Sequence, residues 1–247
     1  MAWVIGWSAS AGAAEVTTAI AKFYPGAKVM SEPSGSIVAN GGRYHAALIQ
    51  RAGVPPGPEL LVVVKETESG ALSEVINSES FDVGGRTVTL VEMRNSSIYL
   101  TLHGSAGCCG HSGRTYQFRL AGERFVLIGE EEISVDFSDK GGARRFYENR
   151  RSINFLTGTA VFSGRIGSAD RALQAGNGHY PEWMPYRIAR ADAREEHTTR
   201  FTANRRWTLE EFDLYAFGKW TLEVKDLCGF FDDALLFKSC TPLIEMR

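Results

Sequence analysis

Short strand-like runs, closely spaced and separated by turn residues, dominate the middle of this 247-residue chain. They combine β-branched and aromatic residues with alternating polar and apolar positions, the pattern of a strand with one buried face. The runs are Arg86–Glu92, Ser97–Leu102, Thr115–Leu120, Arg124–Ile128, Glu132–Phe137, Ser152–Leu156 and Thr159–Ser163. They predict a mainly β protein, an antiparallel meander that forms a sandwich or barrel rather than βαβ units, with a propeller blade as a weaker alternative.

The segments before this region predict a helix and a hairpin. Glu15–Tyr24 has apolar residues at helical spacing, and a proline and a glycine follow it, so we expect a short N-terminal helix. Leu60–Val64 is an apolar run rich in valine, which predicts a buried strand. Ser69-Gly70 is a turn signal that leads to a second strand at Leu72–Ile76.

The C-terminal part, residues 168–247, has a different texture and is expected to be an extension packed on the same sheet, or else a small second module. Ile188–Glu196 predicts a minor polar helix. Trp207–Tyr215 is typical of an amphipathic strand, with a helix as the alternative. We therefore divide the chain into residues 1–14, a β-rich domain over 15–167, and this extension.

The charge of the chain argues against nucleic-acid binding, and its hydropathy argues against a membrane-spanning helix. The chain has 27 Lys and Arg against 29 Asp and Glu, a net charge of -2. Its densest basic runs, Arg144-Arg145, Arg150-Arg151 and Arg205-Arg206, are interrupted by acidic or aromatic residues, so we interpret them as solvated surface and expect no nucleic acid partner. No apolar run reaches the roughly 18 residues of a membrane span, so the protein is not expected to be an integral helical membrane protein.

The first residues indicate export. Ala2–Ala14 is apolar and ends in small residues, like the cleavage region of a signal peptide, although no Lys or Arg precedes Lys22. Residues 1–14 are therefore interpreted as the remnant of a truncated signal peptide, which predicts a periplasmic or secreted protein. The alternative is a small-residue leader on a cytosolic protein.

Four cysteines bear on the same question. In an exported protein they favour disulfides, with Cys228 and Cys240 the simplest pair, while Cys108 and Cys109 are adjacent and would form a vicinal bridge or pair elsewhere. All three connectivities remain open. In the cytosol the same residues would be free thiols.

The stretch His103–Gly113 is the most unusual in the chain, because it gathers Cys108 and Cys109 with two histidines, His103 and His111, on what we expect to be a loop. Thiolates and imidazoles suit zinc or copper, but adjacent cysteines do not readily direct both sulfurs at one tetrahedral ion. We therefore expect disulfides rather than a metal site, and no cofactor.

Three segments resemble a family of exported bacterial proteins of unknown function. They are a Tyr-x-Phe-Arg hairpin at Tyr116–Arg119, a Phe-x-Leu-Ile-Gly strand at Phe125–Gly129, and a Ser-x-Asn-x-Leu-Thr-Gly strand end at Ser152–Gly158. The resemblance covers roughly Leu60–Gly164. It implies export and a β-rich fold, and it transfers no catalytic residue. We interpret these segments as core and turn residues that specify a fold.

Two further groups are candidates for a binding surface. Ser112–Tyr116 matches a short Ser-Gly-x-x-Tyr signature of bacterial lysozyme inhibitors, in which a serine turn enters the enzyme cleft. Tyr180, Trp183 and Tyr186 lie in a proline-containing stretch and would suit recognition of protein or glycan. The alternatives are a hairpin edge and a loop packed over the sheet.

Acidic pairs raise the possibility of catalysis. Glu130–Glu132, Glu195-Glu196, Glu210–Asp213 and Asp232-Asp233 contain the residue types of a glycosidase, but we interpret them as solvated faces. The chain lacks the nucleophile elbow, phosphate-loop, dinucleotide and zinc-helix motifs, and no catalytic residue is assigned.

The sequence therefore favours a non-enzymatic extracytoplasmic binding module, such as an inhibitor or immunity protein directed at an envelope-targeted enzyme, with another protein or an envelope glycan as its partner. One alternative is a carboxylate-dependent hydrolase that acts on glycan or peptidoglycan. Another is a thiol or metal protein that uses the Cys108-Cys109 stretch.

Overall fold

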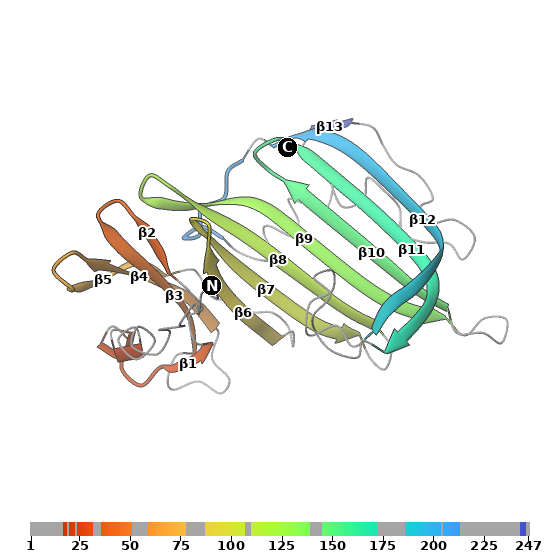
Figure 1. Cartoon of the computed structure of the whole chain (residues 1–247). Coiled ribbons are helices and arrows are strands. Elements are labelled where there is room, and N and C mark those ends of the chain that lie inside the picture. Colours follow the sequence, from red (N-terminus) through yellow and green to blue (C-terminus); the bar gives the residue numbers. More distant parts are fainter. Residues whose placement is uncertain are drawn as a thin grey trace, which may run out of the picture.

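The computed structural model describes residues 17–18, 20–22, 24–31, 36–50, 59–77, 87–106, 110–138, 145–171, 186–203, 205–212 and 243–245. Their strands form a small and a large sheet in which nearly all neighbours are antiparallel (Figure 1). The mainly β, antiparallel fold predicted from the sequence is confirmed. Neither sheet closes on itself within the described strands, and the two share one core, so the fold is a sandwich.

The small sheet has the order β1-β3-β4-β5, with β2 paired to β3. Its strands are β1 (Lys28–Ser31), β2 (Ile37–Ala39), β3 (Gly42–Gln50), β4 (Glu59–Thr67) and β5 (Leu72–Asn77). The predicted hairpin over β4 and β5 is present. Strands β1, β2 and β3 were not predicted, because their side chains do not alternate clearly between polar and apolar.

Strands β3 and β4 are buried on both faces. Leu48 and Val63 belong to the core shared with the large sheet, whereas Ile49 and Val62 pack with Ile20 on the opposite side. A strand covered on both faces needs no polar positions, which explains the uninterrupted apolar run Leu60–Val64 within β4. Residues 17–18 and 20–22 are helical and Tyr24 is a bend, so the described part of the expected N-terminal helix ends before Tyr24. Residues 1–14 lie outside the described part of the chain.

The large sheet is a meander in the order β13-β12-β11-β10-β9-β8-β7-β6. Its strands are β6 (Thr87–Arg94), β7 (Ser97–Ala106), β8 (Gly110–Ala121), β9 (Arg124–Ser138), β10 (Arg145–Asn154), β11 (Thr159–Arg171), β12 (Tyr186–Thr202) and β13 (Leu243–Glu245). Strand β13 pairs in parallel with the end of β12. Strand β11 runs across position 168, where the sequence texture changes.

The two sheets pack through aromatic and aliphatic side chains. Tyr44 of β3 meets Phe125 of β9 edge to face, with ring centroids 5.9 Å apart. At one end of this contact, the Asn40 side-chain amide donates a hydrogen bond to the carbonyl of Gly122, 2.6 Å away, and so joins the β2–β3 turn to the β8–β9 turn. We call the face of the large sheet that is turned toward this core the inner face, and the opposite one the outer face.

Residues 205–212 complete the core and continue the large sheet. The carbonyl of Trp207 accepts a hydrogen bond from Leu127 N, and Leu209 N donates to the carbonyl of Phe125, each at 2.8 Å. This segment therefore lies beside the first half of β9, which extends past the end of β10. Phe212 then packs against Tyr116, with ring centroids 5.0 Å apart.

Besides the His103–Gly113 stretch, the secondary structure differs from the expectation at three places. Ile188–Glu196 is part of β12 rather than a helix, because its backbone pairs with the edge that β11 offers. Arg124–Ile128 and Glu132–Phe137 are one strand, β9, instead of two. Within residues 207–212, Thr208 makes an isolated bridge to Val126 and a turn comes next, so the strand predicted to start at Trp207 ends almost at once.

The turn between β10 and β11 depends on Gly158. Its φ is 62°, a left-handed conformation that L side chains rarely adopt, and a methyl group there would overlap the carbonyl oxygen of Phe201. Gly122 has a similar φ of 64°, but the space around its Cα is open. A side chain at Gly158 would therefore meet both an unfavourable backbone conformation and a steric overlap, whereas a side chain at Gly122 would meet only the unfavourable conformation.

We expect Gly158→Ala to lower the free energy of unfolding by about 3 kcal/mol or more, because overlap with β12 adds to the conformational cost. Gly122→Ala, the matched control, should cost only the left-handed conformation, about 1 to 2 kcal/mol. Urea denaturation of the two variants measures the difference. Equal losses would show that the close approach of Gly158 to Phe201 is not formed.

Candidate functional site

Most residues that the sequence singled out are not placed together by the structure. The following lie outside the described part of the chain: Cys108, Cys109, Cys228, Cys240, Tyr180 and Trp183. His111 and Tyr186 are described as strand positions, His111 opposite Ser105 and Val135, and Tyr186 opposite Arg171. The disulfide and aromatic-loop expectations therefore stay predictions.

The stretch expected to be a loop over His103–Gly113 is mostly strand. Strand β7 continues to Ala106 and β8 begins at Gly110, and these two residues pair with each other. The expectation was wrong because a backbone ladder needs no large side chains, so a run of glycine and serine can still be strand. Residues 107–109 lie outside the described residues.

Ser112 and Tyr116 share the inner face of β8, but neither forms a projecting turn. Ser112 pairs with Gly104 on one side and Ser134 on the other, in the interior of the sheet. Tyr116 is buried in the core, with 1% of its surface exposed. His103 pairs with Gly113, which lies between the inward-facing residues Ser112 and Arg114 of β8. Because side chains alternate along a strand, His103 lies on the outer face. The Ser-Gly turn of an enzyme inhibitor is therefore not formed at Ser112.

A bulge in β9 organises the middle of the large sheet. Gln117 pairs with Gly129, whereas its neighbour Phe118 pairs with Leu127, so Ile128 is an extra residue in β9. One extra residue reverses which side chains face the core from that point on. Before the bulge Phe125 and Leu127 face inward, and after it Glu130 and Glu132 do.

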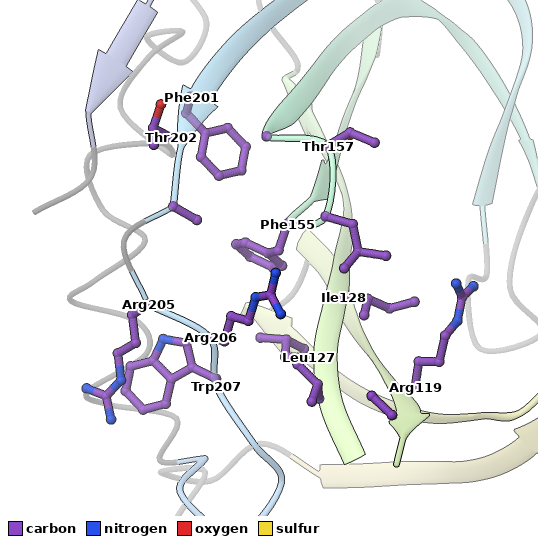
Figure 2. A pocket seen from close by; sticks show the side chains of 15 residues that line it. Arg119, Leu127, Ile128, Phe155, Thr157, Phe201, Thr202, Arg205, Arg206 and Trp207 are labelled. Carbon is purple, nitrogen blue, oxygen red and sulfur yellow. The ribbon is translucent and has the colours of Figure 1, made fainter. Parts of the chain in front are cut away.

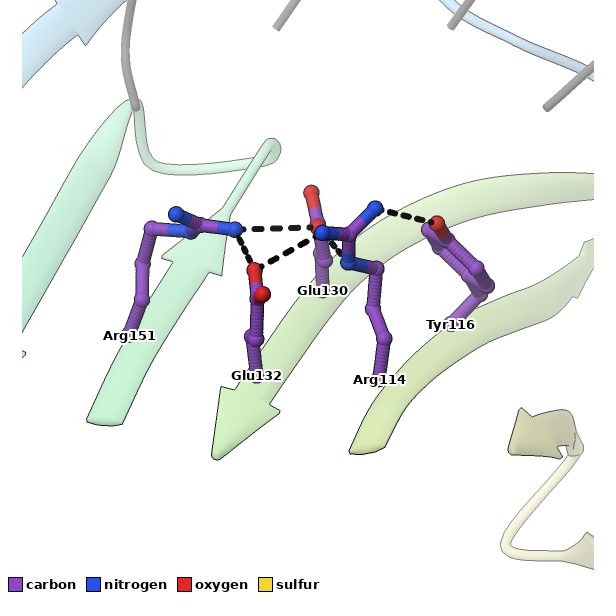
Figure 3. Close-up of polar contacts among 5 residues, drawn as sticks. All are labelled: Arg114, Tyr116, Glu130, Glu132 and Arg151. Atoms are coloured by element: carbon purple, nitrogen blue, oxygen red, sulfur yellow. Dashed lines mark hydrogen bonds and ion pairs between the residues drawn. The ribbon is translucent and has the colours of Figure 1, made fainter. Parts of the chain in front are cut away.

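These two glutamates meet two arginines on the neighbouring strands (Figure 3). Arg114 of β8 contacts Glu130 through Nε at 3.1 Å and Glu132 through Nη2 at 3.0 Å. Arg151 of β10 contacts Glu132 through Nη2, and the same nitrogen lies 3.6 Å from Glu130 Oε1. Each carboxylate is thus engaged by both guanidinium groups, and the four charges balance. We call these four residues the inner ion-pair network.

Glu130 and Arg151 are buried and Arg114 and Glu132 partly buried, which corrects the expectation that Glu130, Glu132 and Arg151 are solvated. The side chain of Glu130 is 0% exposed and that of Arg151 6%, against 19% for Arg114 and 20% for Glu132. Glu131, between the two buried glutamates, points to the outer face and is exposed. Charged residues at consecutive positions were interpreted as one solvated face, although in a strand they alternate between faces.

Tyr116 and Arg114 hold fixed protonation states beside the network. Burial first, and then the negative charge of Glu130, raises the pKa of Tyr116 well above its ordinary value, while Arg114 donates a hydrogen bond to the phenol oxygen at 3.4 Å. Burial acts to lower the pKa of Arg114, but the charge interactions with Tyr116 and Glu130 outweigh it and raise this pKa. The cluster therefore has the character of a structural ion-pair network rather than of an acid–base pair.

The outer face carries a polar hollow of about 550 Å³ above the bulge. Gln117 lies within it and donates hydrogen bonds to the hydroxyl groups of Tyr99, at 2.9 Å, and Ser97, at 3.2 Å. The guanidinium of Arg94 stacks on the Tyr99 ring, 4.1 Å from its centroid, and also contacts Glu92. The hollow is thus rich in hydrogen-bonding groups and roughly balanced in charge.

A second hollow of about 370 Å³ lies where β10 leaves β9 and residues 205–209 take its place (Figure 2). Its lining is mixed: apolar residues such as Val126, Phe155 and Leu156 lie beside two threonines and three arginines. The Phe155 ring meets the buried Phe201 ring edge to face, with centroids 6.1 Å apart. Asn154 holds the adjoining turn, because its Oδ1 accepts hydrogen bonds from the backbone N–H groups of Leu156 and Thr157, each at 3.0 Å.

Three arginines surround this second hollow, which we call the arginine pocket. Arg119, Arg205 and Arg206 are all exposed, and the described residues that line the pocket include no aspartate or glutamate. Arg205 stacks on the indole of Trp207, with its guanidinium carbon 3.6 Å from the ring centroid. A local excess of positive charge in a protein of net charge -2 is a feature that folding alone does not require.

The polar hollow and the arginine pocket adjoin each other. Arg119, Ile128 and Leu156 line both of them, and we call the two hollows together the outer trough. Leu156 is 56% exposed at this junction, a large apolar side chain left in contact with solvent. The bulge that turns Glu130 inward therefore also shapes the middle of the trough through Ile128.

The outer trough was not predicted from the sequence. Arg205 and Arg206 were correctly expected to be exposed, but their pairing in space with Arg119 and the 155–158 turn depends on contacts between distant parts of the chain. The segments that carry the family resemblance were interpreted as fold-determining alone. Each of them nevertheless contributes one of the three shared residues of the trough.

Comparison of the chain with protein-family models, with curated proteins and with solved structures gives no match. Within the described residues, no cluster of three or more metal-ligating side chains is found. No helix in the described part is long and apolar enough to cross a bilayer.

The inner ion-pair network predicts a large effect of removing one charge. We expect Glu130→Gln to lower the free energy of unfolding by about 3 to 5 kcal/mol, because it leaves a buried guanidinium charge uncompensated. Glu131→Gln, next to it on the exposed face, should change stability by less than about 0.5 kcal/mol. Chemical denaturation measures both. Similar small effects of the two substitutions would contradict the buried position of Glu130.

Proposed function

We propose that the protein is a non-catalytic binding module that acts outside the cytoplasm, and that the outer trough is its recognition surface. The observation that carries this proposal is the set of three exposed arginines around a partly apolar pocket that lacks carboxylates among its described lining residues. Exposed apolar and cationic groups that line one hollow are typical of a binding site.

The state of the buried carboxylates supports binding rather than hydrolysis. A glycosidase needs one carboxyl group that gives up its proton and another that attacks or activates water. Glu130 and Glu132 both contact Arg114 and Arg151, and their side chains lie on the inner face, where that of Glu130 is buried and that of Glu132 partly buried. They are better suited to hold three strands in register.

Among binding modules of this kind, we propose an inhibitor or immunity protein that acts on an enzyme of the cell envelope. The apolar segment Ala2–Ala14 with its small residues, the even number of cysteines and the resemblance to exported proteins support export. The position of Ser112 within a strand does not support insertion of a Ser-Gly turn into a catalytic cleft. The proposed contact with the partner is therefore made by the trough.

Export predicts a specific intact mass. Protein recovered from its native host, with thiols alkylated before and after reduction, should lack roughly the first 13 residues and should show four thiols only after reduction. A full-length chain with four free thiols would contradict export and disulfide formation.

Binding through the trough predicts a position-dependent crosslink in the native host. A photoreactive amino acid at Leu156, 56% exposed beside the trough, should give a discrete adduct with one envelope macromolecule. The same group at Val38, 73% exposed on β2 of the small sheet, is the matched control and should give none. Adducts from Val38 alone, or from neither position, would contradict the proposed surface.

A further inference from the structure

The two halves of the outer trough differ in chemistry, and this difference limits what can fill it. The arginine pocket offers apolar side chains and positive charge, whereas the polar hollow offers amide and hydroxyl groups together with the carboxylates of Glu92 and Glu131 and the guanidinium of Arg94. The excess of positive charge therefore lies at the arginine-pocket end of the trough. A ligand that uses the whole trough must combine a bulky apolar group, negative charge and a row of hydrogen-bonding groups. The inference about the class of partner rests on the proposal that the trough is a binding surface.

The arginine pocket is suited to a large apolar side chain flanked by carboxylates. Val126, Phe155 and Leu156 present apolar side chains that are at least partly exposed, and the planar guanidinium of an arginine matches a carboxylate with two parallel hydrogen bonds. In Figure 2, Arg206 projects between the rings of Trp207 and Phe155, while Arg119 lies on the opposite side. An apolar side chain in the pocket would thus have cations on both sides.

The polar hollow is suited to the main chain of an extended peptide. The amide nitrogen of Gln117 donates to Ser97 and Tyr99, so Gln117 offers a ligand its side-chain carbonyl oxygen. Thr101 and Thr115 offer hydroxyl groups that lie 3.0 Å from each other. Peptide N–H and C=O groups require such partners when they leave water. Arg119, shared by both hollows, connects this row to the positive charge of the pocket.

Two other ligand classes use only half of the trough. A fatty acid would fill the arginine pocket and neutralise an arginine, but it has no hydrogen-bonding groups for the polar hollow. An acidic glycan would use the polar hollow, but sugars stack on open aromatic faces, and Trp207 is 2% exposed with Arg205 over its ring. A peptide has both parts.

We propose that the outer trough binds an extended acidic segment of a partner protein, with one bulky apolar side chain in the arginine pocket and flanking carboxylates on Arg119 and Arg206. The segment's main chain lies along Gln117, Thr101 and Thr115. The positive charge also attracts such a segment before contact, so that binding weakens as salt is added.

The test selects short random peptides on the immobilised protein, then measures the affinity of the most enriched peptide by fluorescence anisotropy. Enriched peptides should carry Asp or Glu on both sides of Phe, Leu or Trp. Arg119→Gln and Arg206→Gln should each weaken binding about five- to tenfold, the effect of one lost charge-assisted contact. Arg43→Gln, an exposed arginine of β3, should leave the affinity unchanged.

Three results would overturn the proposal. They are no enrichment of acidic residues, an equal loss of affinity in Arg43→Gln and Arg206→Gln, and preferential binding of an acidic oligosaccharide such as polygalacturonate. If the Leu156 crosslink forms in the host but acidic peptides are not selected, the binding function stands and the acidic class of partner is wrong. If neither occurs, both proposals fail.

Discussion

One extra residue in the ninth strand, Ile128, determines the character of both faces of the large sheet. A strand presents alternate side chains to alternate faces, so a single inserted residue exchanges the faces for every later residue of the strand. Through this exchange Glu130 and Glu132 enter the inner face, where they contact Arg114 and Arg151. On the outer face the same position lines both hollows of the trough. The structural network and the candidate site therefore have a common origin.

The inner ion-pair network makes this register hard to change. A buried ion pair contributes little net stability, because the cost of removing charges from water offsets their attraction, but an unpaired buried charge is strongly unfavourable. A slip of one residue between β9 and either neighbour would leave arginines on the inner face without their carboxylates. The network thus acts mainly by excluding wrong pairings of β8, β9 and β10, and it keeps the trough residues of these strands aligned.

Much of the fold could be predicted from the sequence, because alternation and turn residues are local signals. The turns at Gly70, Gly122 and Gly158 lie where the sequence places them, and each has a positive φ. The bulge could not be predicted, because an extra residue is visible in a sequence only where it breaks the alternation of polar and apolar residues. Val126, Leu127 and Ile128 are all apolar, so no such break occurs there. The burial of Arg151 depends on partners on other strands. The arginine pocket depends on residues separated by up to 88 positions, from Arg119 to Trp207, which no local pattern connects.

The face exchange at Ile128 can be measured directly on the unmodified protein by carboxyl footprinting, in which a carbodiimide couples exposed carboxylates to an amine and mass spectrometry locates the products. Glu130, Glu131 and Glu132 are consecutive and chemically identical, so their rates differ only through their surroundings. We predict rapid labelling of Glu131, protection of Glu130, whose side chain is 0% exposed, and slow labelling of Glu132 at 20% exposure. Rapid labelling of Glu130 and Glu132 with protection of Glu131 would show that the bulge is absent and would contradict the face exchange.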